Sequence, residues 1–273
     1  MTSITLESVA HVLRRNNVRV VGNPDGPTIM LSHGFGCGQD SWRDFVPYFA
    51  DDYRIVLYDL VGAGGSDLSA YDPGRYDSLH GYAEDVLQIL EAIDGTDVTF
   101  IGHSVSSMIG VLASNRDASR FRSLVLVGPS PRYVNDGDYV GGFEQKDIDV
   151  LLDTLDANYL GWSATMAPVI MGNADRPELG ESLTESFCRV DPAIARHFAH
   201  VTFLSDNRRD LAQVQLPTLV IQTLEDAIAP MTVGEFVHEQ IPHSEFAIID
   251  ARGHVPSLSE PETLARVIRG FLP

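Results

Sequence analysis

Short apolar segments, bounded by turn residues, alternate with longer amphipathic stretches, and this alternation constrains the fold more than any other feature. It predicts parallel strands joined by crossover helices. Several segments are apolar throughout, which is typical of strands covered by helices on both faces of a sheet. We therefore expect an α/β fold. The expected strands are Val18–Val21, Thr28–Ser32, Arg54–Asp59, Val98–Gly102, Ser123–Val127, Thr218–Gln222 and Phe246–Ile249, and the expected helices include Leu79–Ile93, Val105–Asn115, Val233–Gln240 and Glu260–Phe271.

One region interrupts this order. Residues 133–215 contain amphipathic helical stretches and loops but no convincing buried strand. Because so long a connection between two strands far exceeds ordinary loop lengths, it predicts an inserted helical cap. Residues 1–132 and 216–273 would then form one core domain, with 133–215 as the cap. The alternative is an ordinary run of crossover helices.

The segment from Val98 to Ser114 carries the clearest chemical signal. An apolar strand runs directly into Gly102-His103-Ser104-Val105-Ser106 and then into a helical pattern. A sharp turn from strand to helix forces strained dihedrals on its serine and exposes the hydroxyl, as in a nucleophile elbow. The usual motif ends in glycine, and here Ser106 takes that place. An incidental serine at a strand-helix junction is the alternative, but the flanking elements favour Ser104 as a nucleophile.

A serine hydroxyl needs a general base and a carboxylate that orients the base. In this architecture the chain order is serine, acid, histidine, and His254 is the one histidine that follows the last expected strand. Glu225 and Asp226 stand side by side after the strand that ends at Gln222. We expect Asp226 to be the acid, and Glu225 is the alternative.

The developing oxyanion needs two preorganised donors, and backbone N–H groups cost no reorganisation. The first would be the N–H of Val105, directly after the nucleophile. The second would be the N–H of Phe35, in the glycine-containing loop after the strand Thr28–Ser32. We interpret His33 in that loop as a structural residue, because His254 already fills the position of the base.

The composition argues against several other functions. Asp and Glu outnumber Lys and Arg by 38 to 19, and the formal charge of -19 disfavours binding to nucleic acid or to an anionic membrane. No zinc-protease, calcium-loop or phosphate-loop motif is present, so we expect neither a metal nor a nucleotide cofactor. The N-terminus lacks an apolar signal core and no apolar run could span a membrane. Cys37 and Cys188 fit no disulfide or metal pattern, and we expect a cytoplasmic protein.

The sequence resembles the RsbQ-like hydrolases, a bacterial group of α/β-hydrolase fold whose relatives include the strigolactone and karrikin receptors of plants. The resemblance is nearly full length and is carried by HGFGCGQDSW, YDLVGAGGSD, RYDSLHGYAEDV, GHSVSSMIG, GPSPRYVND with GGFEQ, and DARGH. The plant receptors share the GHSVS elbow, which supports Ser104. The resemblance implies a mostly parallel central sheet with helices on both faces, a V-shaped cap of four helices, and an apolar pocket with the serine at its floor.

The residues that match the pocket of this family are Phe35, Tyr133, Phe143, Leu151, Trp162, Met166 and Phe203. The karrikin receptors usually carry phenylalanine at the position of Met166, so we expect a pocket of different width. Leu151 could equally be part of the cap core, because helix packing uses the same spacing. The implied ligand is a small hydrophobic molecule. RsbQ-like proteins act in stress signalling with a phosphatase, so the resemblance also implies a regulatory phosphatase partner.

Three functions remain open from the sequence. The chain could be a metabolic esterase or lactonase, or a signalling hydrolase that binds a small hydrophobic molecule and turns it over slowly. It could also be a cofactor-free haloperoxidase or C–C bond hydrolase that uses the same triad. A serine nucleophile excludes dehalogenases and epoxide hydrolases, which use aspartate.

Overall fold

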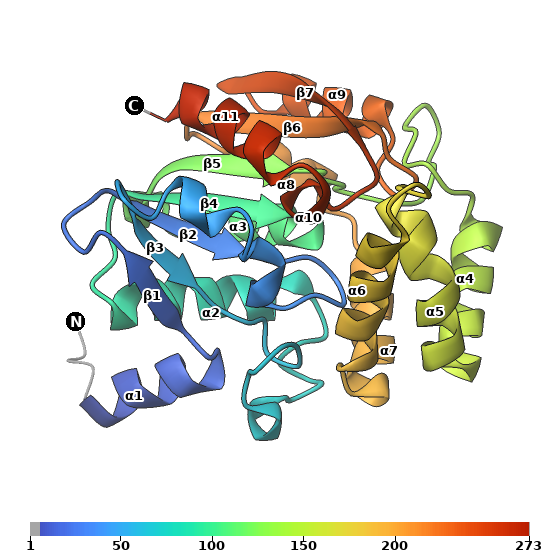
Figure 1. The fold of residues 1–273 in the computed structure, drawn as a ribbon, viewed down its shortest axis with the longest axis horizontal. Helices are drawn as coiled ribbons and strands as arrows, with labels where there is room; N and C mark the ends of the chain where they lie inside the picture. The colour runs from blue at the N-terminus through green and yellow to red at the C-terminus, as the bar shows by residue number, and fades with distance from the viewer. Residues whose placement is uncertain (1–5, 273) are drawn as a thin grey trace.

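The computed structural model describes residues 6–272, which form a seven-stranded sheet with the order β1-β3-β2-β4-β5-β6-β7 (Figure 1). Strand β1 is antiparallel to β3, and every other neighbouring pair is parallel. The predicted α/β class with a mostly parallel sheet is confirmed. The strands are β1 Arg19–Gly22, β2 Thr28–Ser32, β3 Arg54–Leu57, β4 Val98–His103, β5 Phe121–Val127, β6 Thr218–Glu225 and β7 Ser244–Arg252.

Helices cover both faces of the sheet, because successive side chains of a strand point to opposite faces and each face carries apolar side chains. Leu124 and Leu126 of β5 belong to an apolar cluster with side chains of α2, α3 and α9, whereas Val125 and Val127 face a second cluster that includes α11. Figure 1 shows α2 and α3 on one side of the sheet and α11 on the other. The helices are α1 Leu6–Arg15, α2 Leu79–Ala92, α3 Val105–Arg116, α4 Gln145–Ala157, α5 Tyr159–Met171, α6 Pro177–Cys188, α7 Pro192–Phe203, α8 Arg208–Leu211, α9 Met231–Gln240, α10 Pro256–Ser259 and α11 Pro261–Phe271.

All seven expected strands are present, and they differ from the expectation mainly at their ends. The strand β7 continues to Arg252, because its pairing with β6 extends beyond the apolar segment Phe246–Ile249. Three helices, α1, α8 and α10, were not among the sequence expectations; two of them have only four residues each. Short helices carry little periodic signal.

The helices α4 to α7 form a cap that is inserted between β5 and β6. They have an apolar cluster of their own, which includes Ile148 of α4, Trp162 of α5 and Phe187 of α6. In Figure 1 the cap lies at the right of the sheet, on the side toward which the β4 arrow points. The predicted four-helix cap is therefore confirmed, and it covers the end of the sheet at which the carboxyl termini of the parallel strands lie.

Two ion pairs join the chain that runs into the cap to the chain that leaves it. Arg132 contacts Asp206 at 3.1 Å, and Arg208 contacts Asp136 at 2.6 Å. The guanidinium of Arg208 also lies over the ring of Tyr139, 5.0 Å from its centroid. Both connections of the cap therefore meet at one place on the core.

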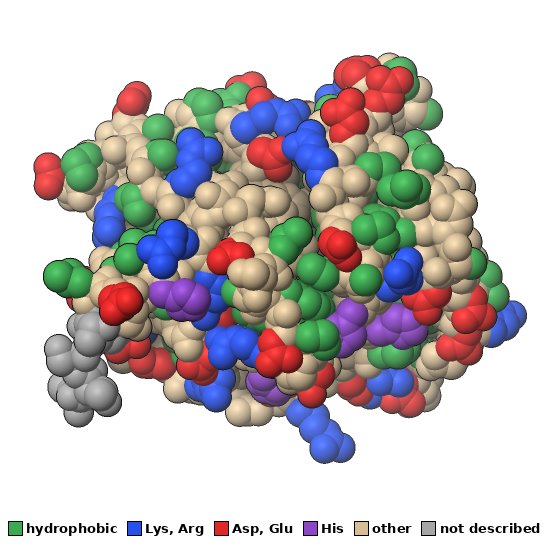
Figure 2. Space-filling model, turned by 90° about the horizontal axis from the view of Figure 1, so that it is seen from below, with side chains coloured by type: hydrophobic (Ala, Val, Ile, Leu, Met, Phe, Trp, Pro, Cys, Tyr) green, Lys and Arg blue, Asp and Glu red, His purple; other side chains and the backbone are tan. Residues whose placement is uncertain are grey.

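Charged side chains of both signs are interspersed on the surface. Figure 2 shows basic side chains lying between acidic ones on one face of the molecule. Within residues 6–272, no helix combines the length and the apolar character that crossing a membrane requires.

Candidate active site

The nucleophile elbow is formed at the junction of β4 and α3. Ser104 has φ 58° and ψ −125°, a conformation that a residue with a side chain rarely adopts. Its N–H donates to the carbonyl of Val127 on the neighbouring strand β5 at 2.8 Å, which anchors the strained turn. Such a turn lifts the hydroxyl off the end of the sheet.

The Ser106 hydroxyl, at the position where the usual motif has glycine, forms two hydrogen bonds. It donates to the carbonyl of His33 and accepts from the hydroxyl of Ser32 at 2.8 Å. A glycine here could do neither. Ser106 thus links the elbow to the end of β2, where the loop with Phe35 begins.

Three side chains from separate loops form one hydrogen-bonded chain. His254 Nε2 lies 2.7 Å from Ser104 Oγ, and His254 Nδ1 lies 2.7 Å from Asp226 Oδ2. Asp226 follows β6 directly, and His254 follows β7. The structure therefore brings together the three residues that the chain order singled out.

Asp226, and not Glu225, faces the histidine. Its other oxygen accepts from the N–H groups of Ile228 and Ala229 at 2.8 and 3.0 Å. Burial opposes ionisation of this carboxyl, but the electrostatic interaction and the hydrogen bond with His254, together with these donors, outweigh it and hold the pKa of Asp226 below its ordinary value. Glu225 is 64% exposed and lies 3.5 Å from Arg252.

The loop that follows β2 lies against the elbow. A Cβ on Gly34 would lie 2.7 Å from His103 Nδ1, so only glycine allows this approach. The N–H of Phe35 takes part in no hydrogen bond among the described residues, and Val105, as the first residue of α3, has no acceptor within its own helix. Both N–H groups are thus available to an oxyanion.

The side chain of His33 links this loop to the segment that follows β3. Its Nε2 accepts from the N–H of Leu60 at 3.0 Å, so its Nδ1 carries the proton and donates to the carbonyl of Gly34 at 2.9 Å. Burial lowers the pKa of His33, which keeps the ring neutral and fits this tautomer. The side chain orients the loop and is no base for Ser104.

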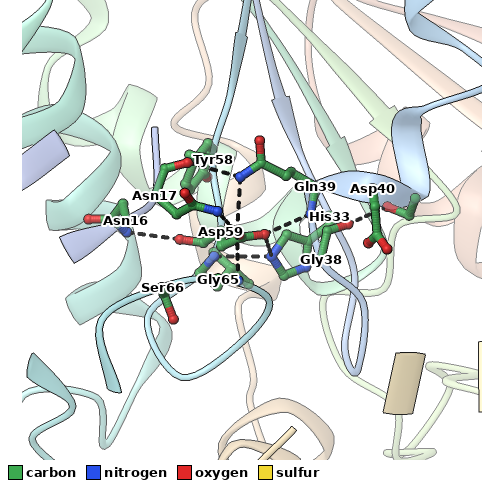
Figure 3. Close-up of polar contacts among 12 residues, drawn as sticks. Asn16, Asn17, His33, Gly38, Gln39, Asp40, Tyr58, Asp59, Gly65 and Ser66 are labelled. Atoms are coloured by element: carbon green, nitrogen blue, oxygen red, sulfur yellow. Dashed lines mark hydrogen bonds and ion pairs between the residues drawn. The ribbon is translucent and has the colours of Figure 1, made fainter. Parts of the chain in front are cut away.

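A buried carboxylate fixes the other end of the loop, and the sequence analysis overlooked it. Asp59, directly after β3, accepts from the backbone N–H of Gln39 at 2.7 Å and from the N–H of Gly65 at 2.9 Å. It also accepts from the side chains of Gln39 at 3.0 Å and Asn17 at 2.7 Å (Figure 3). A Cβ on Gly64 would lie 2.3 Å from Asp59 Oδ1, which explains why this position is glycine.

The imidazole of His103 has a structural role in the site. Its Nε2 donates to the carbonyl of His254 at 2.6 Å, so the neighbour of Ser104 holds the segment that carries His254. Burial, together with the nearby ring of His254, lowers the pKa of His103 to about 3. The ring therefore stays neutral over the range in which such an enzyme works.

A small apolar cavity lies between the cap and Ser104. Phe35, Tyr133, Trp162 and Phe203, which the sequence comparison singled out, line it. Phe35 packs on Phe203 and Trp162 with ring centroids 6.0 and 6.2 Å apart. The remaining lining residues are Cys37, His103, Ser104, Ile170, Leu183, Phe187, Thr202, Ile228, His254 and Val255.

Three other expected pocket residues do not line this cavity. Phe143, Leu151 and Met166 are partly buried and pack against the apolar cluster of the cap. Cys37 is a lining residue that sequence reasoning missed, and burial raises the pKa of its thiol to about 12. No group of three potential metal ligands occurs within residues 6–272.

Comparison with known proteins agrees with this geometry. The family model described as the alpha/beta hydrolase fold matches residues 27–261. A strigolactone esterase of Arabidopsis thaliana is 39% identical over 264 residues, which cover 96% of this chain and 98% of the relative. A karrikin insensitive 2 receptor of Petunia hybrida is 37% identical, with 93% and 94% covered. The solved structure of a hydrolase from Oleispira antarctica has a TM-score of 0.94 and 38% identity, with 98% of both chains covered.

Proposed function

This chain belongs to the α/β-hydrolase family as an esterase-type member, and from that premise we propose that it hydrolyses small, uncharged, hydrophobic esters or lactones. Ser104 is the nucleophile, His254 the general base, and Asp226 the carboxylate that orients it. The observation that carries the proposal is the continuous hydrogen-bonded chain from Ser104 Oγ through both ring nitrogens of His254 to Asp226.

The reaction takes two steps. As Ser104 Oγ attacks the ester carbonyl, His254 Nε2 takes its proton, and Asp226 stabilises the imidazolium that forms. The N–H groups of Phe35 and Val105 stabilise the oxyanion. His254 then gives its proton to the departing alcohol, which leaves an acyl group on Ser104. A water molecule, activated by His254, releases the acid in the second step.

The cavity favours uncharged substrates. Aromatic and aliphatic side chains make up most of its wall, so a charged substituent would lose its hydration without gaining a partner. In this proposal residues 133–215 act as the cap that supplies Trp162 and Phe203, and residues 1–132 with 216–273 supply the triad.

Turnover of p-nitrophenyl butyrate by the purified protein tests this proposal. We expect Ser104→Ala to abolish hydrolysis while the fold persists, because only the attacking oxygen is lost. Ser69→Ala, in an exposed turn of 3-10 helix, is the matched control and should retain turnover. The corresponding hemisuccinate ester should be a much poorer substrate than the butyrate. Undiminished hydrolysis by Ser104→Ala would contradict the assignment.

A slow hydrolase that signals is the second candidate function, because one of the relatives is named a receptor and the cavity lies beneath the cap. The resemblance to RsbQ-like proteins would then extend to a regulatory phosphatase partner. Thermal-shift measurements with uncharged lactones, beside turnover of the same compounds, distinguish the two functions. A large thermal shift with very slow turnover supports the receptor, and rapid turnover supports the metabolic esterase.

A further inference from the structure

One polar residue that lines the cavity has no role in the reaction. Thr202 on α7 lines the cavity and is 1% exposed, and its Oγ1 has no hydrogen-bond partner among the described residues. An unpaired buried hydroxyl costs folding free energy, because it loses its bonds to water on burial. A group held at such a cost in a ligand cavity calls for a partner that the folded chain does not supply.

The other threonines of the cap show that Thr202 is exceptional. In a helix, a threonine hydroxyl usually donates to the carbonyl four residues earlier. Thr154 does so to Val150 at 2.7 Å, Thr165 to Gly161 at 3.0 Å and Thr184 to Gly180 at 2.8 Å. Thr202 has the same opportunity within α7 and does not use it.

The remaining polar groups of the cavity are engaged elsewhere. Ser104 and His254 bond one another, and His103 bonds the carbonyl of His254. Burial raises the pKa of Tyr133 and the Ser104 hydroxyl is its neighbour. Burial likewise keeps the Cys37 thiol neutral. Among the residues that line the cavity, Thr202 has the strongest donor that neither the fold nor the hydrolytic step occupies.

We propose that Thr202 is a specificity-determining residue whose hydroxyl donates to an ether or carbonyl oxygen in the acyl portion of the substrate. The inference rests on the proposed esterase function and narrows its substrate class to esters or lactones whose acyl group carries a second, uncharged oxygen. The acyl portion is the relevant one, because it is bonded to Ser104 in the acyl-enzyme, whereas the alcohol of an open-chain ester has left by then. A site that hydrogen-bonds a substrate oxygen discriminates against the analogue that lacks it.

Paired substrates test the proposal. The first member of each pair is a straight-chain p-nitrophenyl ester, and the second has one methylene replaced by an ether oxygen, which is moved one atom at a time along the acyl chain. For each pair we compare the ratio of kcat/KM for the oxygenated ester to kcat/KM for its all-carbon partner. For the oxygenated ester that fits best, this ratio should be about tenfold larger in the natural protein than in Thr202→Val, because the variant loses one hydrogen bond. Intrinsic reactivity cancels in this ratio. Thr202→Ser, which keeps the hydroxyl, should retain most of the preference.

Thermal unfolding supplies a second measurement. Thr202→Val has nearly the same shape and removes the unpaired hydroxyl, so the melting temperature should rise by about 2–4 °C. Thr184→Val, which breaks a hydrogen bond already formed within α6, should show no such rise. If every oxygenated ester keeps its preference in Thr202→Val, the assignment of Thr202 is overturned. If none of the esters is hydrolysed at all, the proposed function itself fails.

Discussion

The imidazole of His103 donates to the carbonyl of His254 at 2.6 Å, so the residue before the nucleophile holds the segment that carries the base. One buried hydrogen bond therefore fixes two parts of the active site that are 151 residues apart in the chain.

We expect His103→Phe to lower kcat on p-nitrophenyl butyrate by about 10²-fold with little change in KM. Phenylalanine fills the same space but cannot donate, so the His254 ring loses its support, and a misplacement of about 1 Å in an active site can have such an effect. His103→Gln, which keeps a donor, should restore part of kcat. A rise in KM with unchanged kcat would show that His103 shapes the cavity instead.

Asp226→Asn should reduce kcat by about 10⁴-fold, because an amide favours the wrong tautomer of His254. Glu225→Gln is the matched control in the next position and should retain turnover, since this side chain is exposed and faces Arg252. Stopped-flow or steady-state hydrolysis of an activated ester measures both. If Glu225→Gln lost turnover and Asp226→Asn kept it, Glu225 would be the acid of the triad.

The protein should lose stability as the pH falls below about 6.5. Burial lowers the pKa of His103 from 6.5 to about 3 and also lowers that of His33. Below 6.5 the unfolded chain therefore binds protons that the folded protein does not, so the free energy of unfolding decreases until the pH reaches the folded pKa. Near pH 5 the loss from His103 alone is about 2 kcal/mol.

Urea unfolding at about pH 7.5 and pH 5 checks this pH dependence. His103→Gln should show a smaller difference between the two conditions than the natural protein, whatever its absolute stability. An unchanged midpoint in the natural protein would mean that the two histidines titrate normally in the folded state.

Asp59→Asn should lower both kcat and the melting temperature. Asparagine keeps one acceptor oxygen where Asp59 uses two, so the N–H of Gln39 or of Gly65 loses its partner, at about 1–3 kcal/mol for a buried group. The loop with Phe35 is then released at one end. Asp67→Asn, in an exposed turn, is the control. Normal kcat in Asp59→Asn would show that His33 alone positions this loop.

The sequence was sufficient for the parts of the site that have local signals. The elbow at Ser104 is one continuous segment, and Asp226 and His254 follow buried strands in a fixed chain order. The side-chain role of His103 and the anchoring by Asp59 were not predictable, because each depends on which backbone group the fold brings opposite a buried polar atom. The one hint of this anchoring role in the sequence is that Asp59 ends an apolar strand and is followed closely by several glycines.

The sequence predicted that the cap is an insertion, but it did not predict which cap residues line the cavity. A long stretch without strands showed that helices cover the core, and four of the seven expected pocket residues do line the cavity. Met166 and Leu151 could not be separated from Trp162 by helical spacing alone, because residues that face a cavity and residues that face a neighbouring helix repeat with the same period.

The ion pairs of Arg132 with Asp206 and of Arg208 with Asp136 bring both ends of the cap to one point on the core. A segment that enters and leaves the core at one point allows β5 and β6 to keep their pairing when its length or sequence changes. We therefore expect changes in the cap to alter which molecules reach Ser104, provided that they keep the carbonyl of Ile170 in α5, which accepts from the N–H of His254 at 2.8 Å.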